Sequence, residues 1–171
     1  MVLELKVPHG DTFADILPLL PKFLSYVISF VYVAIYWNNH HHMFQLVKQV
    51  NGPTLWANLH LLFWLSLIPF VTAWSGENHF ASMPIALYGV VLLMCSIAYF
   101  ILAQVLIRSH GKDSEIAHAI RTDIKGKFST ALYAIALPVA FYFRYISLAL
   151  YVTVAIIWFI PDSRVEKVLK K

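Results

Sequence analysis

The chain has 171 residues, of which 60% are hydrophobic and only 13% are charged. A soluble domain carries about one quarter charged residues, because charges cover its surface in water. The composition therefore excludes an ordinary soluble enzyme and predicts an integral membrane protein. The net charge of +4 is small, and the basic residues flank apolar runs instead of forming a stripe. This arrangement argues against nucleic acid as a partner.

Five apolar segments follow one another along the chain, each near the length of about 20 residues that crosses a bilayer as a helix. We predict helices because every backbone N–H and C=O in lipid must be paired within its own segment. The segments cover residues 16–37, 55–74, 83–107, 128–143 and 145–160. Together they predict an all-α polytopic membrane helix bundle, with residues 1–171 forming a single transmembrane domain.

The first residues resemble the end of one more helix. Met1 to Val7 reads like two last helical turns, stopped by Pro8 and the following Gly10. We expect the rest of this sixth helix to lie N-terminal to Met1, with five complete transmembrane helices after it. A short amphipathic stretch is expected at residues 116–124.

Basic residues gather on one side of the expected helices. Ten of the 13 Lys and Arg residues fall in segments 38–53 and 108–127 or in the tail after Pro161. The other three are Lys6, Lys22 and Arg144. Loops rich in Lys and Arg stay in the cytoplasm, so this bias predicts a cytoplasmic C-terminus.

The densest polar segment is Trp37-Asn-Asn-His-His-His-Met-Phe44. Three consecutive histidines do not converge on a metal ion, because neighbours on a helix point about 100° apart. Two interpretations stay open: an interfacial belt anchored by Trp37, or a network in which one histidine meets Asn58 or His60 on the next helix. For the network we expect His42 to be buried and His40 and His41 to be more exposed. Haem ligation by His42 and His60 is a further, weaker alternative.

No enzyme signature is present in the sequence. The chain has no HExxH, Gly-x-Ser-x-Gly or P-loop motif and no acidic cluster within its apolar segments. Cys95 is the only cysteine, so no disulfide forms within the chain. We therefore expect neither enzymatic activity, nor a metal site, nor a cofactor.

Four strings resemble a known family. They are Val2-Leu-Glu-Leu-Lys-Val-Pro8, Ile35-Tyr-Trp-Asn-Asn-His-His-His42, Asn58-Leu-His-Leu-Leu-Phe63 and Leu67-Ile-Pro-Phe70. The chain is similar through them to the prokaryotic branch of the lysosomal potassium channel called transmembrane protein 175. The family's Phe-Ser-x-x-x-Asp signature on its first helix is missing here.

The resemblance implies a homotetrameric, potassium-preferring cation channel in the plasma membrane of a prokaryote. It implies that Leu3 and Leu5 belong to an apolar pore lining and that Glu4 lies near the outer mouth. It also implies that four residues match positions that brace the pore helix: Trp37, Asn38, His42 and Asn58. The hydrogen-bond network expected from the residues themselves adds His60 to this set.

From the residues and the resemblance together we predict passive conduction of potassium ions through a homotetrameric pore in the lipid bilayer. A ring of apolar side chains is able to gate such a pore by dewetting. Substitutions at outward apolar positions such as Leu92 are expected to leave conductance and ion preference unchanged. The alternatives are a non-transporting membrane scaffold or assembly subunit, and a haem- or quinone-linked membrane redox protein.

Overall fold

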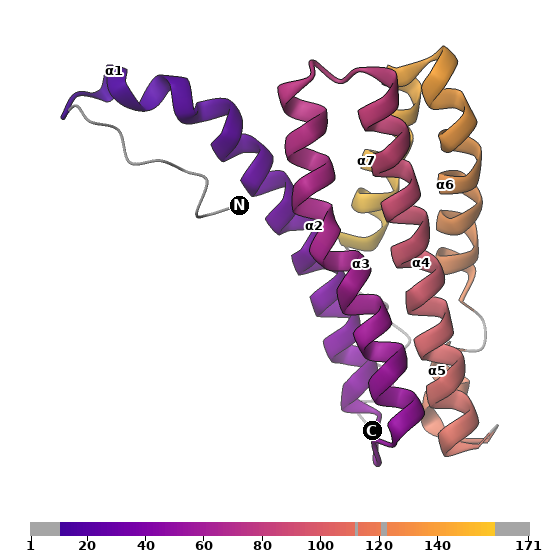
Figure 1. Ribbon diagram of the computed structural model, residues 1–171. Coiled ribbons are helices and arrows are strands. Elements are labelled where there is room, and N and C mark those ends of the chain that lie inside the picture. The colour runs from indigo at the N-terminus through magenta and orange to yellow at the C-terminus, as the bar shows by residue number, and fades with distance from the viewer. Residues whose placement is uncertain (1–10, 112, 121–122, 160–171) are drawn as a thin grey trace.

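All regular structure in the computed structural model is helical within residues 11–111, 113–120 and 123–159, which are the residues that the structure describes. The prediction of an all-α fold is confirmed. The pore positions Leu3, Glu4 and Leu5 lie outside the described residues. The elements are α1 (Phe13–Ile16), η2 (Leu17–Leu19), α2 (Leu20–Gln45), α3 (Gly52–Glu77), α4 (Ser82–His110), α5 (Glu115–Ile120), α6 (Ile124–Tyr142) and α7 (Arg144–Phe159) (Figure 1).

Local chemistry explains where these helices begin and end. The Asn51 side chain accepts the backbone N–H of Thr54 at 3.0 Å and caps α3, and Asp123 caps α6 by accepting the N–H of Gly126 at 2.8 Å. Helix α4 ends at Gly111, whose φ of +90° favours glycine. Of the amphipathic stretch expected at residues 116–124, residues 116–120 belong to α5, which buries Ile116, and Ile124 begins α6.

The helices have the length and composition of membrane-spanning segments. Within the described residues, α3 and α4 are each long and apolar enough to cross a bilayer. Residues 13–19 and 22–45 pass the same test only together, as a broken span or a re-entrant loop bent by 57°, and α7 is a shorter apolar helix. The chain is thus a helical membrane protein, while five complete crossings remain a prediction.

Helix α4 occupies the centre of the bundle. It packs against α3 on one side and α6 on the other, while α2 lies along α3 and α7 lies along α6. Figure 1 shows α1 and the start of α2 leaning away from the other helices. As a result, the second half of α2 joins the bundle and its first half stays largely exposed.

Four buried tyrosines connect the helices at the core. Tyr88 of α4 contacts Tyr32 of α2 and Tyr151 of α7, with ring centroids 5.9 and 5.8 Å apart. Tyr133 of α6 lies 6.1 Å from Tyr151. These edge-on and tilted ring contacts add stabilisation beyond the area that they bury. We call these four residues the tyrosine cluster.

Gly89 makes room for the cluster. Tyr151 is fully buried, and its hydroxyl donates a hydrogen bond to the Ile85 carbonyl at 3.2 Å. A Cβ at Gly89 would overlap that hydroxyl. Small residues allow close approach of helices in membranes, and Gly89 has this role here.

One surface assignment from the sequence is wrong. Leu92, expected to face outward, is fully buried in the core of α4. Helix α4 lies between α3 and α6, so its apolar residues face protein on several sides. Ile135 on α6 and Ile156 on α7 are outward apolar positions, 56% and 65% exposed.

The ends of α2, α3 and α4 are held together by hydrogen bonds to His110 and Ser109 of α4. Nε2 of His110 accepts the backbone N–H of Lys48 at 3.1 Å, and its Nδ1 lies 2.9 Å from the Leu106 carbonyl. A carbonyl only accepts, so Nδ1 carries the proton and Nε2 is free to accept. The Asn51 amide also donates to Ser109 at 3.0 Å. These bonds fix the α2–α3 connection beside the end of α4.

Gly89→Ala should destabilise the protein by about 1–3 kcal/mol, because the added methyl overpacks against Tyr151. Thermal unfolding in detergent measures the effect. Gly52→Ala is the matched control, since a Cβ there meets no atom within 4 Å. Tyr151→Phe removes the overlapping oxygen, so the double variant should lose less stability than the sum of the singles. Equal melting temperatures for Gly89→Ala and Gly52→Ala would refute the contact.

Candidate helix-bracing site

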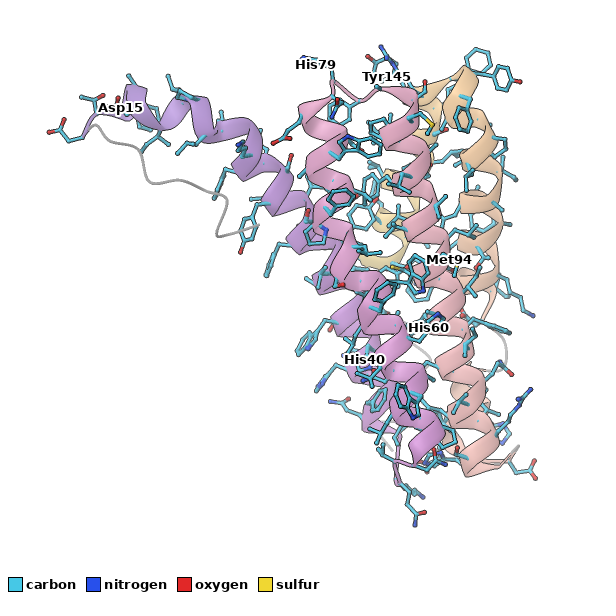
Figure 2. All side chains as sticks on the ribbon, in the orientation of Figure 1. Asp15, His40, His60, His79, Met94 and Tyr145 are labelled. Carbon is cyan, nitrogen blue, oxygen red and sulfur yellow. The ribbon has the colours of Figure 1, made fainter. Side chains whose placement is uncertain are left out.

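The candidate site lies where the second half of α2 runs beside the first half of α3. The histidine-rich segment is entirely helical and continues α2 to Gln45. Figure 2 shows His40 and His60 in the same part of the bundle, with His79 and Tyr145 at the opposite end. Successive residues of α2 point about 100° apart, so this segment divides into three faces.

One face of α2 contacts α3 through His40. Its Nε2 lies 2.8 Å from Oδ1 of Asn58, and its ring stacks on Phe44 with centroids 4.3 Å apart. Since the amide oxygen only accepts, His40 donates from Nε2. A half-buried polar side chain on α3 thus has a partner on α2.

This contact corrects the sequence expectation for His42. His40, and not His42, meets Asn58, and both histidines are half-buried. Histidines two positions apart differ by about 200° around the helix, so only one of them faces α3. The ring of His42 lies 6.3 Å from that of His41.

A second face of α2 points outward. Trp37 is 62% exposed and stacks on His41, with centroids 5.1 Å apart and planes 10° from parallel. The Gln45 amide donates to Nε2 of His41 at 3.0 Å, so this nitrogen is unprotonated. Trp37, His41 and Gln45 recur every four residues and form one outer strip, which we call the outer face of α2.

The third face enters the core at Asn39, which the sequence interpretation missed. Asn39 is only 6% exposed, and its amide donates to the carbonyls of Ile35 at 2.8 Å and Trp158 at 3.4 Å. The Tyr99 hydroxyl donates to the Asn39 carbonyl at 3.3 Å. Helical spacing could have identified Asn39 from the sequence, because Tyr32, Asn39 and Met43 form one buried stripe along α2.

The other expected members of the network have different surroundings. Asn38 is half-buried beside these faces. His60 accepts the indole N–H of Trp64 at 3.0 Å, within α3 itself. His40 and Asn58 are therefore brought together, whereas Trp37, His42 and His60 make their ring or hydrogen-bond contacts elsewhere.

The geometry does not resemble a metal centre. Among the residues that the structure describes, no three His, Cys, Asp or Glu side chains gather in a way that would hold an ion. The three consecutive histidines point to different neighbours. What the site offers instead is a fixed hydrogen-bond pair toward α3 and an aromatic strip on the outer face of α2.

His40→Ala should lower stability by about 1 kcal/mol, the scale of a hydrogen bond between membrane helices, because it strands Asn58 and removes the Phe44 stack. His42→Ala should cost less, and His118→Ala, on the exposed side of α5, serves as a surface control. A double-mutant cycle of His40→Ala with Asn58→Ala should show coupling. Zero coupling, or a larger loss from His42→Ala, would contradict the assignment.

Comparisons with known proteins bear on the same residues. Residues 1–69 match the family described as endosomal/lysosomal potassium channel TMEM175, and the whole candidate site falls within that range. No solved structure matches the chain.

Three curated relatives are named potassium channels. That of Chryseobacterium sp. is 54% identical over 171 residues, which are all of this chain and 89% of the relative. That of Streptomyces collinus is 28% identical over 58% of this chain and 52% of the relative. That of Chamaesiphon minutus is 32% identical over 45% of this chain and 41% of the relative.

The resemblance drawn from the four strings is confirmed by these matches. They also confirm the interpretation as a potassium channel and not an enzyme, since both the family and its relatives are channels. The chain belongs to the TMEM175 family of potassium channels.

Proposed function

We propose that the protein conducts potassium as a homotetramer, through a pore on the axis between subunits and not through the interior of one subunit. The supporting observation is the apolar core within the described residues. Leu61, Leu92, Leu102 and Tyr151 are each fully buried, and they pack in one continuous cluster along the bundle. Ions need a continuous water-filled path across the membrane, and such packing leaves none along this core of the described residues.

Closed cyclic symmetry places the same segment of every subunit around the axis. We assign this place to the N-terminal segment, with Leu3 and Leu5 as an apolar constriction and Glu4 near the outer mouth. The outer face of α2 supports the assignment. Its exposed Trp37 and His41 are suited to brace a neighbouring helix, because stacked aromatic rings present a rigid, partly polar surface.

The direction of the chain in the membrane is the next part of the proposal. The His110 bonds place Lys48 beside the end of α4, where Arg108 also lies, and Lys125 and Lys127 begin α6. The positive-inside rule assigns such a basic end to the cytoplasm, here at the plasma membrane of a prokaryote.

A fluorescent reporter fused after Lys171 should therefore fluoresce in the cytoplasm, and an alkaline phosphatase fused there should be inactive. An active phosphatase would reverse the orientation.

Leu3→Asn and Leu5→Asn should change conductance or the preference for potassium over sodium, because polar groups wet an apolar neck. Planar-bilayer recording from purified protein measures both quantities. Ile156→Asn is the control: it is an outward apolar position on α7, and it should leave the permeability ratio unchanged.

Native mass spectrometry of the same preparation tests the assembly, for which the mass of four chains is expected. A stable monomer or dimer that conducts selectively would rule out the shared pore. Unaltered currents in both leucine variants would move the constriction away from the N-terminal segment.

A further inference from the structure

A cavity of about 440 Å³ lies among α2, α4, α6 and α7 and shares Asn39 with the candidate site. This volume is within the range of sites that hold small ligands, roughly 300–1,000 Å³. Figure 1 shows α7 behind α4, with α2 and α6 on its two sides. The cavity borders the tyrosine cluster at Tyr32 and Tyr133.

The walls of the cavity are predominantly apolar. Aromatic side chains from three helices, Tyr36, Phe100 and Trp158, line it together with alanines of α6 and α7. Phe100 is 50% exposed, and the lining residue Ala134 is exposed as well. The mouth of the cavity therefore opens on the side of the bundle between apolar side chains, as a site reached from lipid would.

Five polar side chains in the wall are bonded to one another or to the nearby backbone. Ser96 and Thr130 share a hydrogen bond of 2.7 Å, and the Trp158 indole donates to Ser129 at 2.8 Å. Asn39 donates to two backbone carbonyls, as described above. Since these groups already have partners and most of the wall is apolar, an apolar occupant fits the cavity best.

One end of the cavity is charged. Lys127, in the first turn of α6, is exposed and belongs to the lining. Asp123 lies at the same end, but one of its carboxylate oxygens accepts the N–H of Gly126 and closes the start of the helix. Lys125 extends toward the Ile157 carbonyl, 3.5 Å away, at the neighbouring end of α7. An anionic headgroup would complement the exposed ammonium.

We propose that this cavity binds one acyl chain of an anionic phospholipid, whose phosphate lies at Lys127. The occupant is a lipid because the cavity is apolar, opens sideways between membrane helices and ends at a basic residue. An acyl chain matches the first two properties, and a phosphate matches the third. Occupancy of this site is measurable by a binding assay, without recording current.

Quenching of Trp158 fluorescence by phosphatidylglycerol with brominated acyl chains tests the proposal in detergent micelles. The fluorescence of Trp158 is the difference between the emission of the unsubstituted protein and that of Trp158→Phe. We expect saturable quenching with phosphatidylglycerol and weaker quenching with brominated phosphatidylcholine. Lys127→Gln should weaken phosphatidylglycerol binding about fivefold, the scale of one Lys near an anionic membrane surface. Lys48→Gln, a basic residue outside this cavity, should leave binding unchanged.

Ala134→Phe should block quenching by filling the cavity. Ile135→Phe, the next residue on α6 and outside the lining, should not. Absence of Trp158 quenching would mean that protein fills the space, from this chain or a second copy, and would overturn the proposal. Equal quenching by both lipids, or no effect of Lys127→Gln, would overturn the anionic headgroup. Persistent quenching in a folded Ala134→Phe variant would overturn the site.

Discussion

The contact of Tyr151 with Gly89 is the interaction on which the tyrosine cluster at the centre of the bundle depends. It brings α7 against α4, and Tyr88 and Tyr133 then extend the same group of rings to α2 and α6. Helices in lipid gain little from hydrophobic burial against each other, because lipid tails are as apolar as their side chains. Close packing at a glycine and ring contacts among tyrosines are the available alternatives, and this bundle uses both.

Helix α2 shows how one segment serves several purposes at once. His40 holds it to α3, Asn39 holds it to α7 and α4, and the strip with Trp37 and His41 remains on the outside. Consecutive residues achieve this because each step along a helix turns the side chain by about 100°. The polar segment is therefore part of the bundle's framework as well as a surface for a neighbour.

The two ends of the molecule differ in how tightly their helices are held together. At one end, the start of α2 leans away from the bundle and exposes apolar residues such as Phe23 and Phe30. At the other, His110 and Asn51 tie α2, α3 and α4 together by hydrogen bonds. The charged end of the proposed lipid cavity, at Lys127 in the first turn of α6, belongs to the end held by hydrogen bonds.

Much of the fold was predictable from composition and local patterns. The five apolar segments correspond to the five long helices, because a transmembrane helix is recognised from the transfer energies of its own residues. The boundaries were less accurate: α2 continues to Gln45, through a polar segment that the apolar pattern alone does not include. The cap at Asn51 and the end of α4 before Gly111 are explained by local residue chemistry, although the sequence analysis did not predict them.

The partners of individual side chains were decided only by tertiary structure. The choice of His40 over His42 for Asn58 depends on the rotational phase of α2 against α3, and an error of one residue turns the face by about 100°. Leu92 is buried because α4 lies at the centre of the bundle. The sequence of α4 does not reveal which helices surround it. By itself the sequence determined a helical membrane channel of a recognisable family, since apolar length and short motifs are local. Helix packing determined which residues meet, since it depends on every segment at once.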